Sequence, residues 1–289
     1  MKFGNPFTNP HVASIGEDGL FKLWREDPLS PTNSGRRWQL AAQLKSETKV
    51  PFQSLDFKFL MTETFLALIT RDGYLTISEP RDHDSLQDLQ HIHREHVCPT
   101  PSRQEETGLR VCWHREKLPC WTAVQAGVPR TALSLAVAAM NVVKILRTDR
   151  DRKFYCAAEI KGPEAIIRDV AWANGSMRGY DLIATACKDG HIRIYEVNTP
   201  GPTKTAAVTE NHSSREKEKG RVAAMSVVSG IGAGLAVGKE KESVLSKRED
   251  RVRHLVKKVA DLERPHGGVW RLQWSFMGKF ENTMWKSGN

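Results

Sequence analysis

The chain has 289 residues, of which 39% are hydrophobic and 27% charged, and its formal net charge is +9. This composition is ordinary for a water-soluble globular protein of one or two domains, and its five cysteines form no C-x-x-C pair, which argues against zinc and thioredoxin-type sites. No stretch has the form of a signal peptide or a membrane span, and no basic run is interleaved with aromatic residues, so we expect no transmembrane segment and no direct nucleic-acid partner.

The first predicted element is a β-hairpin in residues 10–25, which read PHVASIGEDGLFKLWR. Asp18 and Gly19 suit a tight turn, because Asp-Gly tolerates the positive φ angles of two-residue hairpin loops and apolar residues flank the pair. Ser14 lies four residues before Asp18, and Trp24 lies six residues after it. We expect the carboxylate to cap the turn, and the hydroxyl and the aromatic ring to join one network across the hairpin.

A second hairpin is predicted for residues 65–78, FLALITRDGYLTIS, around Asp72 and Gly73. Here Leu68 stands in place of the hydroxyl and Ser78 in place of the aromatic ring. The hairpin is therefore expected without the side-chain network of the first copy.

A polar loop is predicted for residues 80–107, which are rich in Pro, Ser, Asp and His. It contains a run of histidines at His91, His93 and His96, for which a metal site and a solvated cluster are the two interpretations. The second is favoured, because the run has neither a helical pair of histidines four residues apart nor an H-E-x-x-H motif. We therefore expect no metal ligand, and no cofactor, in this chain.

Residues 132–146, ALSLAVAAMNVVKIL, form a degenerate copy of the hairpin with Met140 and Asn141 at the expected turn. Alternating runs that end in Trp or Phe precede the hairpins after the first, and another opens the last segment: residues 53–59, 109–113, 166–172 and 269–274. A strand, a turn and a hairpin together form the blade unit of a β-propeller.

The clearest repeat of the first hairpin pattern is in residues 181–196, DLIATACKDGHIRIYE. Asp189 and Gly190 occupy the turn, and Thr185 and Tyr195 lie at the offsets where the first hairpin has its hydroxyl and its aromatic ring. The repeated pattern predicts that both stretches are outer hairpins of propeller blades.

Residues 201–250 are rich in Lys, Glu, Ser and Gly and have no aromatic residue, so we expect a disordered low-complexity insert. In residues 251–262 the apolar residues lie at helical spacing, which predicts a helix on the propeller surface. We therefore divide the chain into propeller blades in residues 1–200, the insert in residues 201–250, and the start of a last blade with an atypical C-terminus in residues 251–289.

The stretches ASIGEDGLFKLW, ATACKDGHIRIY and GGVWRLQW resemble the WD-repeat family. A narrower resemblance, to the Sec-thirteen-homologue nucleoporins of the Y-shaped pore subcomplex in their fungal form, is carried by KDGHIRIYEV, NVVKILRTDRDRKFYCAAEIKG, and SGIGAGLAVGKE followed by RHLVKKVADLERPHGGVWRLQW. It covers residues 10 to 278, and the Sec-thirteen coat protein is a close alternative. The implied fold is an all-β WD-repeat propeller. In that fold residues 258–262 form an outer strand that leads into the last blade, which is the alternative to the surface helix.

The chain departs from the six blades of that family at both ends. No counterpart of the first blade is visible, and MKFGNPFTNP before His11 is expected to hold no inner strand. GKFENTMWKSGN replaces the last Asp-Gly hairpin and its closing aromatic residue. We therefore expect an open, incomplete propeller with about four to five blades, truncated at both ends, and two exposed sheet edges.

The resemblance implies a non-enzymatic scaffold of the nuclear pore that supports protein and mRNA transport. It also implies an α-helical solenoid partner that inserts strands into the open ring, other subunits of the Y-shaped subcomplex, and a second place in a vacuolar coat-like complex that regulates amino-acid signalling to TOR. The expected locations are the nuclear envelope and the vacuolar membrane. Alternatives are a coat subunit of vesicles from the endoplasmic reticulum and a WD-repeat adaptor that reads peptides. Motifs of hydrolases and nucleotide-binding enzymes are absent from the sequence, so no catalytic residue is predicted.

Overall fold

The structure is a computed structural model, and it describes residues 2–3, 10–60, 62–83, 86, 88–175, 179–200, 251–263, 267–275 and 280–283. The predicted insert, residues 201–250, lies outside the described residues.

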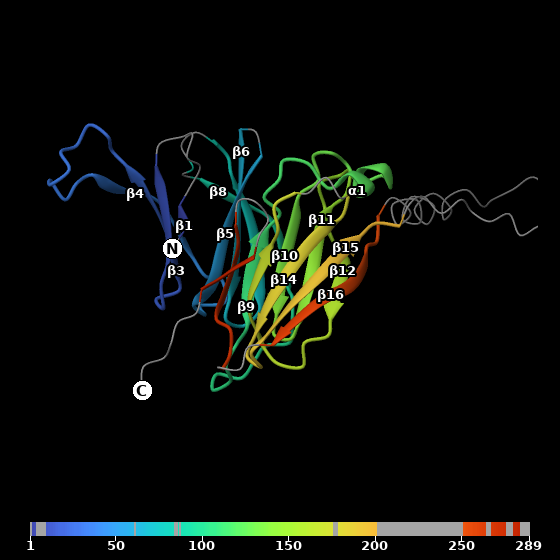
Figure 1. The fold of residues 1–289 in the computed structure, drawn as a ribbon. Helices are drawn as coiled ribbons and strands as arrows, with labels where there is room; N and C mark the ends of the chain where they lie inside the picture. Colours follow the sequence, from blue (N-terminus) through green and yellow to red (C-terminus); the bar gives the residue numbers. More distant parts are fainter. Residues whose placement is uncertain are drawn as a thin grey trace, which may run out of the picture.

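The described chain folds into five antiparallel sheets that follow one another in sequence order and stand side by side (Figure 1). The first sheet contains β1 (Lys2–Phe3), β2 (His11–Ile15), β3 (Leu20–Glu26) and β4 (Trp38–Lys45); the second contains β5 (Phe52–Leu60), β6 (Glu63–Thr70), β7 (Tyr74–Pro80) and β8 (Leu89–His96); the third contains β9 (Leu109–Trp113), β10 (Ser134–Ala139), β11 (Val142–Thr148) and β12 (Phe154–Lys161); the fourth contains β13 (Ile167–Trp172), β14 (Asp181–Cys187), β15 (His191–Asn198) and β16 (Leu255–Glu263); the fifth contains β17 (Arg271–Trp274) and β18 (Phe280–Thr283). This arrangement confirms the open all-β propeller.

The inner strands β5, β9, β13 and β17 lie next to one another, so each sheet forms one blade. Side chains of one inner strand accept hydrogen bonds from the backbone of the next. Asp56 accepts from the Trp113 N–H at 2.8 Å, and Asp169 accepts from the Leu272 N–H at 2.8 Å. These bonds fix the relative height of neighbouring blades.

The apolar core lies between neighbouring sheets. Phe21 and Leu23 of the first sheet pack in one cluster with Leu66 and Leu68 of the second. Similar clusters join the second sheet to the third, the third to the fourth and the fourth to the fifth. A middle sheet is therefore covered on both faces, which is why the whole of β10 is buried and its sequence, SLAVAA, is nearly all apolar.

Three expectations about secondary structure were wrong or incomplete. A short inner strand does precede His11, because β1 pairs with β2, with Phe3 opposite Val12. Within the predicted polar loop 80–107, residues Leu89–His96 form β8, since the alternating histidines pair with β7. In the segment 251–262 the strand interpretation holds and the helix is wrong, because β16 pairs with β15 along its length.

The atypical end of the chain also forms a hairpin, in which Arg271 lies opposite Thr283 and Trp274 lies opposite Phe280. The only helix among the described residues is α1 (Trp121–Gln125), which the sequence did not predict. No helix in that part of the chain has the length and apolar character that a membrane crossing needs.

Candidate interaction surface

The first sheet has one face against the second sheet and one face that is partly exposed. On the partly exposed face the strand register places Val12 opposite Trp24 and Trp24 opposite Leu40. Leu40 is 48% exposed, and Trp38, two residues earlier on β4, is 39% exposed. Three strands thus present an apolar row on the side of the sheet that faces away from the core.

The fifth sheet lies at the other end of the series and has two described strands where the other sheets have four. Its inner strand is anchored to the fourth sheet, because Leu272 is buried there and the Trp274 indole N–H donates to the Ala171 carbonyl at 3.1 Å. Among the described strands β18 pairs with β17 alone, so its second edge offers backbone N–H and C=O groups to a further strand.

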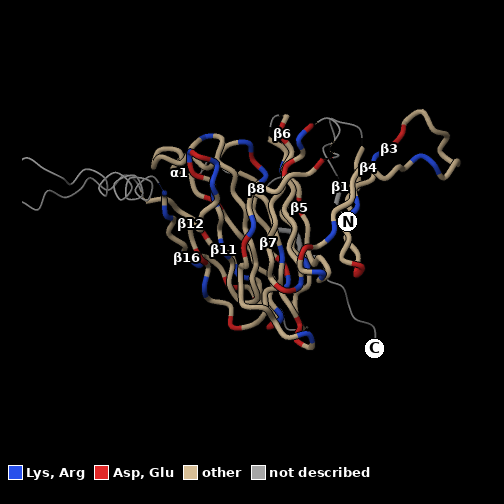
Figure 2. The backbone as a smooth tube through the Cα atoms, turned by 180° about the vertical axis from the view of Figure 1, so that it is seen from behind, with Lys and Arg blue, Asp and Glu red and all other residues tan. Residues whose placement is uncertain are grey.

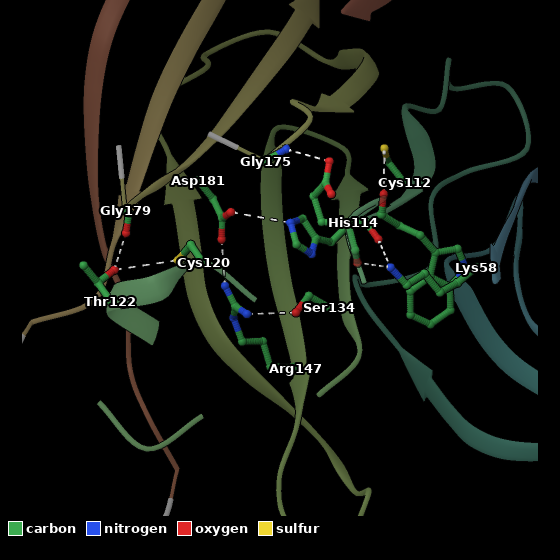
Figure 3. A network of polar contacts seen from close by, with 12 residues as sticks. Lys58, Cys112, His114, Cys120, Thr122, Ser134, Arg147, Gly175, Gly179 and Asp181 are labelled. Atoms are coloured by element: carbon green, nitrogen blue, oxygen red, sulfur yellow. Dashed lines mark hydrogen bonds and ion pairs between the residues drawn. The ribbon is translucent and has the colours of Figure 1, made fainter. Parts of the chain in front are cut away.

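A buried polar network joins the second, third and fourth sheets (Figure 3). The Arg147 guanidinium on β11 donates to the Ser134 hydroxyl and to the Asp181 carboxylate, both at 2.9 Å. His114 Nε2 lies 3.6 Å from the same carboxylate, and the Lys58 ammonium donates to the His114 carbonyl at 2.6 Å. All five residues are less than 5% exposed.

Burial controls the protonation of this network. It lowers the pKa of His114 to about 4, because desolvation disfavours the imidazolium and outweighs the attraction of Asp181. It also lowers the pKa of Lys58 to about 8. An ion pair closed off from solvent in this way is out of reach of a ligand, and removal of either partner would leave the other charge buried and uncompensated. Sequence reasoning missed the network, although a charged Arg147 inside the apolar run VVKILRT was a usable signal.

Comparison with known proteins supports the family resemblance, although no family model matches the chain. The chain is 34% identical over 180 residues to Nucleoporin SEH1 of Chaetomium thermophilum, and 27% identical over 271 residues to Nucleoporin SEH1 of Saccharomyces cerevisiae. These alignments cover 53% and 92% of this chain. These similarities, together with the propeller fold, are consistent with a member of the Sec13/Seh1 WD-repeat family. The sec13 protein transport protein of Emericella nidulans matches at 23% identity over 207 residues, which is 70% of this chain and 62% of that protein.

The chain spans 33% of the length of the Chaetomium relative and 70% of the length of the Saccharomyces relative.

The predicted turn aspartates all lie in the hairpin loops. Asp18 accepts from the Leu20 N–H at 3.0 Å, and Asp189 accepts from the His191 N–H at 3.0 Å. Asp72 accepts a short hydrogen bond from the Thr70 hydroxyl. Each following glycine has a positive φ: Gly19 +71°, Gly73 +81° and Gly190 +84°. The stabilising role of these residues stays a prediction.

The predicted hydroxyl and aromatic pairs behave differently in the two hairpins. In the first sheet the Trp24 indole N–H donates to the Ser14 hydroxyl at 3.2 Å. In the fourth sheet the Thr185 hydroxyl donates to the Arg193 carbonyl at 3.5 Å. Burial raises the pKa of Tyr195 to about 12, and the side-chain contact with Thr185 has a smaller opposing effect. The hydroxyl and the ring thus lie together in both hairpins, but Thr185 also bonds a backbone carbonyl.

The histidines of β8 do not converge. His91 bonds the Ser78 hydroxyl through Nδ1 at 2.9 Å, and the His93 ring lies against Phe154. The His96 ring lies against Tyr74 in a tilted contact. A bulge between Ile77 and Ser78 sets His91 and His93 opposite adjacent residues of β7, whose side chains point to opposite faces of the sheet. Within the described part of the chain, no group of three or more His, Cys, Asp or Glu side chains could hold a metal ion.

Proposed function

We propose that this protein is a non-enzymatic structural scaffold subunit of the nuclear pore, in the Y-shaped subcomplex. The observation that carries the proposal is the match to proteins named Nucleoporin SEH1 in three fungi, together with an open series of blades. In this role the protein supports the transport of protein and mRNA and is located at the nuclear envelope.

The partner that fits the two ends of the series is an α-helical solenoid subunit that contributes strands of its own. A guest strand along β18 satisfies the backbone groups of that edge, and guest residues over the first sheet cover Trp24, Trp38 and Leu40. Each square ångström of apolar surface removed from water contributes about 25 cal/mol, so the apolar row favours association over solvent exposure.

A pull-down of the tagged full chain from a native extract tests this proposal. We expect pore scaffold proteins, including a solenoid subunit, to co-purify. Leu40→Glu should reduce recovery of the solenoid, since it places a charge in the apolar row, whereas Leu118→Glu should not. Leu118 is a matched control because it is also an exposed leucine, at 57%, in the loop before α1. Equal recovery with both variants would contradict docking on the first sheet.

A second function is a subunit of a vesicle coat from the endoplasmic reticulum, and the matches to two fungal sec13 proteins at 23% and 22% identity favour it. Coat proteins in the pull-down, without pore proteins, would favour this function. A vacuolar coat-like complex in TOR signalling rests on the family resemblance, and recovery of its subunits, with the chain at the vacuolar membrane, would support it. Ubiquitin-ligase or histone-modifying subunits would instead indicate a peptide-reading adaptor.

A further inference from the structure

Basic side chains gather at one end of the inner strands, in a place that the proposed scaffold role does not use. Arg110 lies on β9, Arg168 on β13 and Arg271 at the start of β17. Lys188 lies in the turn after β14, and Trp270 directly precedes β17. We call these five residues the inner-strand patch. Elsewhere, Lys and Arg are interspersed with Asp and Glu over the loops (Figure 2).

The core of the inner-strand patch is held rigidly. The Arg110 guanidinium donates to the Arg168 carbonyl at 3.0 Å and to the Gln53 carbonyl at 2.9 Å, so it bridges three blades. The Arg168 guanidinium lies 3.7 Å from the centre of the Trp270 ring, in a cation–π contact. Arg168, which is nearly buried, covers one face of the indole. Because Trp270 is still 51% exposed, the rest of its apolar ring surface is open to a ligand.

The acids near the patch leave it net positive. Glu106 pairs with Arg168 at 2.9 Å and with Lys188 at 2.7 Å. Asp169 is partly buried and already accepts a hydrogen bond from the Leu272 N–H. Burial raises its pKa, against the opposing effects of that hydrogen bond and of Arg110 and Arg271. Four cations thus face two acids, and exposed Arg271 has no ion pair among the described residues.

A close backbone approach fixes the position of the aromatic ring. A Cβ atom on Gly268 would lie 2.5 Å from Arg168 Nη1 and 2.8 Å from the Lys188 carbonyl oxygen. The Val269 N–H, one residue further, donates to the Cys187 carbonyl at 3.1 Å. Trp270 is therefore held against Arg168 before any ligand arrives, which lowers the entropy cost of binding.

We propose that the inner-strand patch binds a short acidic peptide segment of a partner protein. Carboxylates of the segment pair with Arg271 and Lys188, and an apolar side chain between them packs on the open face of Trp270. A single-stranded nucleic acid fits less well, because successive bases need successive rings and Glu106 would repel a continuous phosphate backbone.

Fluorescence anisotropy with the full chain tests this inference. The probe is a fluorescein-labelled pool of eight-residue peptides with Asp or Glu at alternate positions and Leu or Phe between them. We expect saturable binding that weakens as salt is added. Arg271→Glu and Trp270→Ala should each weaken it at least tenfold, since both side chains are exposed and neither supports the core. The matched control Lys161→Glu, at a lysine that is 74% exposed on β12, should change it less than twofold.

Three results would overturn the inference. They are no saturable binding of the acidic pool, equal binding of a pool with Lys in place of the acids, and equal loss of binding in the Lys161→Glu control. Tighter binding of an eight-nucleotide thymidine strand than of the peptide pool would also overturn it, in favour of nucleic acid. Since the first sheet and β18 take no part, Leu40→Glu should leave peptide binding intact, which separates this result from failure of the scaffold proposal.

Discussion

The first and the fourth sheets start from nearly the same hairpin sequence and end in different surroundings. In the first, Ser14 and Trp24 lie on a partly exposed face beside Leu40, which is 48% exposed. In the fourth, Thr185 is fully buried and Tyr195 is 3% exposed, because the third sheet packs over them. The Asp-Gly turn thus specifies the hairpin, while the neighbouring blade decides whether a side chain serves the core or stays free for a partner.

The largest effect is expected where the fourth sheet meets the third. Asp181→Ala leaves the Arg147 guanidinium buried without its carboxylate, which should lower the free energy of unfolding by about 3–5 kcal/mol. Unfolding of the full chain in urea measures this loss. The matched control is Arg152→Ala, which removes an ion pair with Glu63 whose arginine side chain is 60% exposed, and should cost less than about 1 kcal/mol. Equal losses in the two variants would show that the buried pair does not bind the sheets together.

The two faces of the first sheet give the next largest contrast. Leu23→Ala removes a side chain that is 1% exposed and should cost about 3 kcal/mol through the cavity that it leaves. Leu40→Ala, on the opposite face of the same sheet, should cost less than about 1 kcal/mol, because water already reaches the side chain. The same urea measurement compares them. A large loss for Leu40→Ala would mean that another part of the protein covers this face.

Sequence reasoning succeeded where structure is local. An Asp-Gly pair between apolar runs sets the turn and both strands by itself, so the hairpins at Asp18, Asp72 and Asp189 were predictable. It failed at β8, because the alternating histidines were interpreted as a polar loop although every second residue of the strand is partly buried. The alternation typical of a strand was present in the sequence, but histidines at the alternating positions made the segment look uniformly polar.

The buried network was beyond sequence reasoning for a different reason. Lys58, His114, Arg147 and Asp181 are spread over more than a hundred residues, and only the packing of three sheets brings them together. No local pattern states which charges will share one site. The inner-strand patch has the same origin, since its residues come from separate blades.

Acidification should lower the free energy of unfolding by an amount between those of the core variants and the turn variants, through buried His114. The pKa of His114 is about 4 in the folded chain and about 6.5 when exposed, so the unfolded chain takes up the proton first as the pH falls. The neutral imidazole therefore stabilises the fold above pH 6.5, and this contribution is lost as the pH falls from 6.5 towards 4. We expect a loss of about 2 kcal/mol between pH 7 and pH 5.

The variant His114→Gln tests this assignment, because it removes the titrating group and should flatten that part of the pH profile. His96→Gln is the control, since His96 is exposed on β8 and its ring contacts only the Tyr74 ring among the described aromatic residues. Unfolding in urea at a series of pH values measures both. An unchanged profile in His114→Gln would assign the acid sensitivity to another group, such as buried His254, whose pKa is lowered to about 3.

The smallest expected change in the free energy of unfolding is at the Asp-Gly turns of the first and fourth sheets. Asp18→Ala removes one backbone hydrogen bond and a loose pairing with Lys22 at 3.8 Å, so it should cost about 0.5 kcal/mol. Asp189→Ala should cost about 1–2 kcal/mol, because Asp189 also accepts from the nearly buried Arg193 guanidinium at 2.9 Å. Urea unfolding of both variants gives the difference between two turns with the same sequence motif. If the two losses are equal, the turn alone sets the stability of a blade hairpin, and the covering sheet adds nothing to it.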